Sequence, residues 1–200
     1  MSIRVLTVVV FLGVMGLLAL QRFSGTPELT VVVAAVSEES NFHTGEELRR
    51  GEVVSTPSGF LELLIGNDTH VYLAAQTQIE LHRIFEDEII VKLKKGRIVV
   101  STESETPVRI ITNQTESLIH KSAASFVNYD FLQTVHVIPL SGSVQLTLGD
   151  EYLLTPVPIS ITETDPVSYA TLEVNLEAGD SKTFYEWTGV LSTDVLDFSR

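Results

Sequence analysis

Histidines are the side chains of this sequence that could most directly bind a metal ion or transfer a proton near neutral pH. Metal sites often show them at short fixed spacings, such as His-x-x-x-His or Glu-x-x-His, which bring two ligands to one face of a helix. Neither spacing occurs here, and the five histidines are scattered along the chain: His43, His70, His82, His120 and His136. We therefore expect ordinary strand or loop histidines rather than metal ligands or catalytic bases.

Two other short motifs could carry chemistry. Ser141-Gly142-Ser143 lacks the Gly-x-Ser-x-Gly frame of a nucleophile elbow, and a hairpin turn is the simpler interpretation. Glu86-Asp87-Glu88 could bind calcium if a loop turned its carboxylates inward, but an acidic triplet at the start of a strand is usually solvated. The prediction is that the chain is not an enzyme and has no catalytic residues, no metal site and no cofactor.

The glycines also lack the spacing of a phosphate-binding loop. We expect them instead at positions where the backbone needs a positive φ or approaches another segment closely. The four glycines to which this applies are Gly51, Gly66, Gly96 and Gly142.

Composition excludes several classes of function. The chain has 200 residues, with 13 basic and 26 acidic side chains and no cysteine. Because Arg4 and Arg22 are the only bases before residue 23, the remainder carries 11 bases against 26 acids, a formal charge of −15. Such a surface repels phosphate backbones, so no nucleic-acid partner is expected. Without cysteine there are no disulfides, thiolate metal sites or thiol catalysis, which favours a prokaryotic envelope protein.

An uninterrupted apolar run, Val5 to Leu20, lies near the start of the sequence. A helix from Ile3 to Leu20 would be roughly 27 Å long, close to the thickness of the hydrocarbon core of a bilayer. The residues that follow offer no good signal-peptidase site, which favours an uncleaved anchor over the alternative of a cleaved signal peptide and a secreted protein. We expect a single-pass membrane protein with a cytoplasmic N-terminus, because an acidic domain after so short a tail is most simply exported.

Beyond residue 22, apolar and polar side chains alternate with the period of half-buried β-strands. The clearest case is a predicted hairpin, in which Phe60–Ile65 and a strand containing Val71 and Leu73 flank the turn Gly66–Thr69. Further strands are expected at Thr30–Val36, Ile79–Leu81, Ile89–Leu93, Ile98–Val100, Val108–Ile110, Val135–Val137 and Val144–Leu148. Turn residues recur at roughly ten-residue intervals, which is typical of sandwiches, barrels and β-solenoids. The predicted fold class is therefore all-β.

The alternation of apolar and polar side chains is weaker in residues 150–200. Prolines break this region and favour edge strands or loops; they are Pro156, Pro158 and Pro166. Short helices are expected at Ala178–Thr188 and Leu191–Phe198. The region is either a β extension of the same domain or a poorly paired tail, and its aromatic group of Phe184, Tyr185 and Trp187 is expected in the core rather than on a partner surface.

Two short motifs of the β-rich region are more specific for a protein family than the alternation alone. They are Gly51-Glu52-Val53-Val54-Ser55-Thr56 and Leu93-Lys94-Lys95-Gly96-Arg97-Ile98. With the hairpin between them and the later pair Gly142 and Val144, they resemble the extracytoplasmic domain of FecR-like proteins. In that family, the domain begins with the motif Gly-x-x-Val-x-Thr, which is followed by an apolar strand, a polar turn and a Val-x-Leu strand. The motifs Leu-x-x-Gly and Gly-x-Val come later in the domain. The resemblance covers about half the chain. One element departs from it, since Ala124-Ser125-Phe126 stands where the family has Gly-Thr-x-Phe.

The resemblance implies a β-solenoid or twisted β-sandwich that faces the periplasm or the cell exterior and serves sensing, scaffolding or protein contact rather than catalysis. Classical members also carry a cytoplasmic domain that binds a sigma factor. Only Met1 to Arg4 precede the apolar run here, so direct sigma-factor control is not expected.

The predicted organisation has four parts: a transmembrane anchor at 1–22, a spacer and first strand at 23–44, a FecR-like β domain at 45–149 and a C-terminal β extension or tail with a possible short helix at 150–200. The predicted function is a membrane-anchored, non-catalytic module that binds another envelope protein or an envelope polymer. The alternative is a sensor or regulatory component of transmembrane signalling, which would need a partner to carry its signal.

Overall fold

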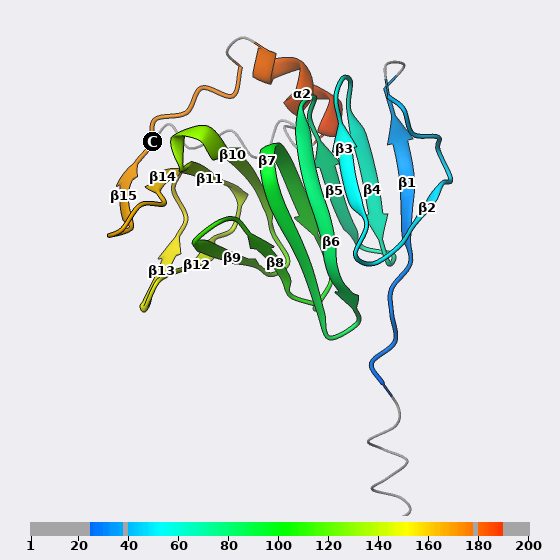
Figure 1. Cartoon of the computed structure of the whole chain (residues 1–200), viewed down its shortest axis with the longest axis horizontal. Coiled ribbons are helices and arrows are strands. Elements are labelled where there is room, and N and C mark those ends of the chain that lie inside the picture. The colour runs from blue at the N-terminus through cyan, green and yellow to red at the C-terminus, as the bar shows by residue number, and fades with distance from the viewer. Residues whose placement is uncertain (1–24, 38–39, 178–179, 190–200) are drawn as a thin grey trace, which may run out of the picture.

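The computed structural model describes residues 25–37, 40–177 and 180–189, and these form an all-β body with one short α-helix (Figure 1). Fifteen strands of the described chain join into one continuous sheet. They are β1 (Val31–Val36), β2 (Glu47–Leu48), β3 (Val53–Thr56), β4 (Leu61–Ile65), β5 (Thr69–Leu73), β6 (Thr77–Phe85), β7 (Glu88–Thr102), β8 (Val108–Ile111), β9 (Thr115–Ile119), β10 (Ala123–Tyr129), β11 (Thr134–Ser141), β12 (Val144–Leu148), β13 (Glu151–Thr155), β14 (Ile159–Thr162) and β15 (Ser168–Thr171). The helices are α2 (Asp180–Thr188) and a short 3-10 helix, η1 (Asp130–Leu132).

The sheet folds into two layers that face each other across one core (Figure 1). Layer A has the order β3-β6-β7-β8-β9-β12-β13, and layer B has the order β2-β1-β4-β5-β7-β10-β11-β14-β15. Neighbouring strands are antiparallel except β7 and β8, which are parallel. The described chain thus has the all-β fold class that the sequence predicts, with its one sheet folded as a two-layer sandwich.

Strand alternation builds the core as the sequence predicts. In the β4–β5 hairpin, Leu61, Leu63 and Ile65 are buried while the residues between them are only partly buried. The inward side chains of β6 and β7 meet them from layer A, and all belong to one cluster of buried aliphatic residues. At roughly 25 cal/mol per Å² of apolar surface removed from water, this shared interior is the main force that holds the layers together.

The long strand β7 belongs to both layers. Its first half, up to Lys95, pairs with β6 and β8 of layer A, whereas from Gly96 onward it pairs with β5 and β10 of layer B. The chain turns at Gly96, whose φ is +92°. The two segments that the sequence predicts here, Ile89–Leu93 and Ile98–Val100, are therefore one strand that bends through the predicted glycine.

Side chains from both layers hold this corner. The hydroxyl of the buried Thr77 accepts a hydrogen bond from Arg97 N and donates one to Arg97 O, both at 3.0 Å. On the other side, Asn128 Nδ2 donates to the carbonyls of Leu93 and Lys94 at 2.8 and 3.0 Å. These hydrogen bonds give the backbone carbonyls of Leu93, Lys94 and Arg97 partners at the bend. A buried carbonyl without a partner would destabilise the fold.

The other three predicted glycines also have positive φ, so that prediction is confirmed. The interpretation of Ser141-Gly142-Ser143 as a hairpin turn is wrong. The strands that it connects do not pair with each other: β11 pairs with β10 and β14, while β12 pairs with β9 and β13. The segment is instead the connection by which the chain crosses from layer B to layer A. Local turn chemistry looks alike in both cases, since both need a residue with positive φ.

Residues beyond 149 extend the same two layers. Strand β13 pairs with β12 in layer A, and β14 and β15 continue layer B beyond β11. The sheets likewise run through the predicted boundary at residue 45, because β1 pairs with both β2 and β4.

Helix α2 packs on the outer face of layer B. Its Phe184 and Tyr185 are buried against side chains such as Val99 and Ile138, and the rings of Phe60 and Phe184 lie 5.5 Å apart. The predicted helix at Ala178–Thr188 is confirmed from Asp180 onward, and the aromatic group is core as predicted, with Trp187 partly buried. The predicted helix at Leu191–Phe198 lies outside the described residues.

The proposed anchor, 1–22, also lies outside the described residues. Within the part of the chain that the structure describes, no helix is long and apolar enough to cross a membrane.

We predict that Gly96→Ala lowers the free energy of unfolding by at least about 2 kcal/mol, because it combines backbone strain with a clash. A Cβ at this position would lie 2.5 Å from the Cα and Oγ1 of Thr77. The control is Gly51→Ala, whose φ is +82° but whose Cβ would meet nothing within 4 Å, so a loss of about 1 kcal/mol is expected. Urea denaturation measures both, and equal losses would contradict the close approach at the corner.

Candidate functional site

The histidines predicted to be ordinary residues lie apart on different elements. The Nδ1 of His70 on β5 lies 2.7 Å from Glu62, and the Nδ1 of His82 on β6 lies 3.0 Å from Glu80. His136 on β11 packs edge-on against Tyr129, with ring centroids 5.0 Å apart. Among the described residues, no group of three or more His, Asp or Glu side chains is placed to hold a metal ion.

In the acidic triplet Glu86-Asp87-Glu88, the first two residues form the turn between β6 and β7, and Glu88 is the first residue of β7. Both carboxylate oxygens of Asp87 accept hydrogen bonds from Arg83, at 3.0 and 2.8 Å. Glu88 accepts from Nε and Nη2 of Arg109, at 3.0 and 2.8 Å. Two of the three carboxylates therefore pair with guanidinium groups, which is how an acidic run on a solvated surface is commonly neutralised.

A cluster of charges around Glu80 covers the outer face of layer A. Lys94 Nζ lies 3.0 Å and Lys92 Nζ 3.4 Å from its carboxylate, and His82 approaches from the same strand. The hydrogen bond from Lys94, followed by that from His82, lowers the pKa of Glu80 from 4.5 to about 2. Both ammonium groups contact the single carboxylate of Glu80, so these contacts stabilise the surface of the sheet while the two lysines and Glu80 together keep one net positive charge.

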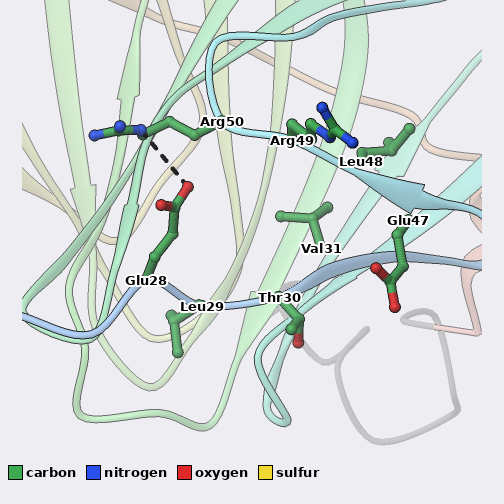
Figure 2. A pocket seen from close by; sticks show the side chains of 8 residues that line it. All are labelled: Glu28, Leu29, Thr30, Val31, Glu47, Leu48, Arg49 and Arg50. Carbon is green, nitrogen blue, oxygen red and sulfur yellow. Dashed lines mark ion pairs between the residues drawn. The ribbon is translucent and has the colours of Figure 1, made fainter.

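A hollow of about 460 Å³ lies between the segment that precedes β1 and the residues around β2 (Figure 2). Figure 2 shows the side chains of Arg49 and Arg50 pointing in opposite directions, with Arg50 reaching Glu28. The Arg50 Nε lies 3.6 Å from that carboxylate. The one ion pair among the residues that line the hollow joins Arg50 to Glu28, and this contact helps to fix the N-terminal segment to the body.

The two layers end together on the side away from that segment, at a place that we call the open end, formed by β13 of layer A and β15 of layer B (Figure 1). Within the described chain, β13 pairs only with β12 and β15 pairs only with β14. Each strand therefore presents one row of backbone groups to solvent, which is a template for pairing with a further strand.

Exposed apolar side chains gather at this open end. Tyr152 and Leu154 on the outer face of β13 are 75% and 65% exposed, and Tyr169 on β15 is 49% exposed. Between them, Leu153 packs partly against the shared core. A pair of free edges that also exposes large apolar side chains is the feature of the described surface best suited to binding another chain.

The sequence pattern does not identify this surface, although one run of apolar residues points to it. In Glu151-Tyr152-Leu153-Leu154-Thr155, apolar residues occupy three consecutive positions, so they cannot all face the core of a two-layer sandwich. The prolines that follow lie in the loops beside β13, β14 and β15, and only the sheet topology shows that β13 and β15 are edges at one end of the molecule.

Comparisons with known proteins add little to this geometry. No family model and no curated protein matches the sequence, so the resemblance to FecR-like proteins stays a prediction. Two solved structures, each described as a candidate anti-sigma factor from Parabacteroides distasonis, share 17% identity with this chain at TM-scores of 0.47 and 0.46. They cover 70% and 72% of this chain, which spans only 62% and 61% of theirs. Similarity at this level carries no argument about function.

We predict that Glu80→Gln destabilises the protein at pH 7 by less than about 1 kcal/mol, as expected for a surface ion pair. Because folding lowers the pKa of Glu80 from 4.5 to about 2, its contribution is full above about pH 4.5 and disappears as the pH falls through about 2. Denaturation midpoints of the variant and the original chain should therefore converge in that interval.

Glu47→Gln is the matched control, because Glu47 is exposed on β2 and makes no ion pair with the described residues. The change in the free energy of unfolding that Glu47→Gln causes is expected to be small and constant over the same pH range. A difference between Glu80→Gln and the original chain that persists unchanged at pH 2 would contradict the assigned role of the Lys94 contact.

Proposed function

We propose that this protein is a non-catalytic binding module of the FecR-like kind, anchored in the membrane and exposed outside the cytoplasm. Its ligand is another envelope protein, which adds an extended segment to the free edge of β13. The observation that supports this best is the combination, in one strand, of an unpaired edge with the two most exposed large apolar side chains of the β-strands, Tyr152 and Leu154.

The scarcity of charged residues on β13 and β15 supports a partner strand that is itself uncharged and apolar. The chain carries a formal net charge of −13, yet β15 has no charged residue and β13 has only Glu151. Natural proteins commonly protect a free edge with lysine, proline or inward-pointing charges; β13 contains neither lysine nor proline, and its one charge, Glu151, lies at the start of the strand on the core-facing side. Main-chain hydrogen bonds would supply affinity, and the side chains of Tyr152 and Leu154 would supply selectivity.

The attachment of the N-terminal segment supports a body held close to the bilayer. Leu29 N donates to Ile84 O at 3.0 Å, Glu86 N donates to Pro27 O at 3.1 Å, and Glu28 forms a bridge with Phe85. If residues 1–22 form the anchor, only residues 23–26 separate it from this paired segment. Four residues span at most about 14 Å, so the sandwich would stand on the membrane with its open end directed away from the attachment point.

The orientation can be tested by protease treatment of intact cells. Exported β-strands would be cleaved, or an epitope after residue 189 lost, without lysis, while a fragment containing the anchor stays in the membrane fraction. Protection in intact cells combined with cleavage after lysis would contradict an extracytoplasmic body. A soluble, shortened chain in the medium would indicate a cleaved signal peptide instead.

We predict that the double change Tyr152→Ser and Leu154→Ser weakens partner binding at least tenfold, because it removes both exposed apolar side chains without altering the core. A photo-reactive amino acid at position 154 should capture one specific envelope protein in intact cells. That protein is then purified, and its affinity for the original chain and the double variant is measured by calorimetry.

Val53→Ser is the matched control, since Val53 is 52% exposed on β3, the edge strand at the opposite side of layer A. It should leave affinity unchanged. Equal weakening by both variants, or a cross-link formed equally well from position 53, would contradict a site at β13. Dimerisation of the chain that the double variant abolishes would replace the envelope protein by a second copy and overturn the assignment of the partner.

A further inference from the structure

A row of three side chains crosses the outer face of layer B at adjacent strands. Arg97 on β7 lies opposite Val127 on β10, which in turn lies opposite His136 on β11. Because neighbouring strands are about 4.8 Å apart, the backbones of Arg97 and His136 are separated by roughly 10 Å with the apolar Val127 between them. The row places a cation and an imidazole on the two sides of a hydrophobic floor.

The C-terminal part of the chain covers this row. Residues Leu172–Leu176 and the first turns of α2 pass over it, and together they enclose a pocket of about 180 Å³. Ile138 extends the apolar floor, while Val174 and Leu176 line the opposite wall. The pocket is therefore apolar above and below and polar at its two sides.

Arg97 forms one of these sides. Its Nη1 donates to Ser181 Oγ at 2.7 Å, and its guanidinium carbon lies 5.6 Å from the centroid of the Tyr185 ring. Its Nε is buried and has no hydrogen-bond partner among the described residues. Glu173 also lines the pocket, but it is exposed, and no ion pair joins it to Arg97.

The missing partner sets Arg97 apart from the other partly buried arginines of the described chain, whereas the exposed Arg49 also lacks an ion pair. Arg50, Arg83 and Arg109 each pair with at least one carboxylate of the described chain. Arg97 is more enclosed than a surface arginine and yet is not neutralised by any described acid, although acids outnumber bases two to one. A partly buried cation without a counter-ion is costly, and planar carboxylates are the anions that a guanidinium pairs with best.

His136 and Tyr129 form the other side of the pocket. Burial, followed by the charge of Arg97, lowers the pKa of His136, so the imidazole is neutral at pH 7. A neutral imidazole offers one donor and one acceptor, and the Tyr129 hydroxyl offers another donor. This side suits a neutral polar group rather than a second anion.

We propose that this pocket binds a small carboxylate ligand, with Arg97 pairing to the carboxylate and Val127 and Ile138 contacting a short apolar body. The inference is independent of the proposed function, because the pocket lies on the outer face of layer B under α2, whereas the proposed partner site is the edge of β13. The carboxylate could belong to a free organic acid or to the end of a peptide chain, and the experiment separates these sources.

The test is an NMR titration of the full-length chain with butyrate and, in parallel, with butyramide, which has the same shape without the charge. Butyrate is expected to shift the amide signals of Arg97, Val127 and His136 in a saturable manner, whereas butyramide should bind at least tenfold more weakly. Arg97→Gln should abolish the saturable shifts, and Arg97→Lys should weaken them by at least a few-fold, because lysine lacks the planar fork. Circular dichroism spectra and melting temperatures establish that both variants fold.

Arg49→Gln is the matched control, because it removes the same charge from an arginine that makes no ion pair with the described residues and lies in the other hollow. It should leave butyrate binding unchanged. Equal binding of butyrate and butyramide, or no saturable shift with butyrate at 50 mM, would overturn the proposal. Binding that appears only after Glu173→Gln would also overturn it, since an acid of the chain itself would then occupy the pocket.

A second arm compares a short apolar peptide with a free C-terminus and the same peptide with an amidated end. Tighter binding of the free-ended peptide than of butyrate assigns the carboxylate to a peptide terminus. Binding of butyrate without binding of the free-ended peptide assigns it to a free organic acid.

Discussion

The close contact between Gly96 and Thr77 is the constraint on which the rest of the sandwich depends. One strand can serve two facing layers only if its backbone turns where no side chain intervenes, and Gly96 with its positive φ allows this. Hydrogen bonds from Thr77 and Asn128 then satisfy the backbone on both sides of the bend. Layers A and B extend from β7 toward the same side of the molecule, so their last strands, β13 and β15, both lie at the open end (Figure 1).

A polar contact far along the chain keeps the layers aligned on that side. Glu163, only 1% exposed at the end of β14, accepts hydrogen bonds from Gln114 N at 3.0 Å and from the hydroxyl of Thr112, both in the loop between β8 and β9. Its own backbone N donates to Gln133 O at 2.7 Å. One residue of layer B therefore binds a loop of layer A and the loop before β11. Hydrogen bonds are directional, whereas the hydrophobic effect that drives formation of the aliphatic core is not, so these contacts add geometric specificity to the alignment of the layers.

The sequence predicts the local structure well and the long-range arrangement poorly. Alternation identifies the β4–β5 hairpin and the inward side chains of β6 because period two reflects a single strand with one buried face. It cannot show that Ile89–Leu93 and Ile98–Val100 are one bent strand, or that Ser141-Gly142-Ser143 crosses between layers, since these depend on which distant strands pair. The same limit hides the open end and the pocket at Arg97, whose residues come from β7, β10, β11 and the C-terminal segment.

The open end also shows how a free edge can persist on a protein surface. Strand β13 has no lysine or proline of its own, so local features do not prevent two copies from pairing there. The formal charge of −13 acts instead on the whole molecule, and it opposes the approach of any other strongly acidic body before the edges can meet. At physiological ionic strength this repulsion extends only about 8 Å from the surface. It therefore hinders self-association of large acidic faces while leaving a short, uncharged edge accessible to an extended segment of a less acidic partner.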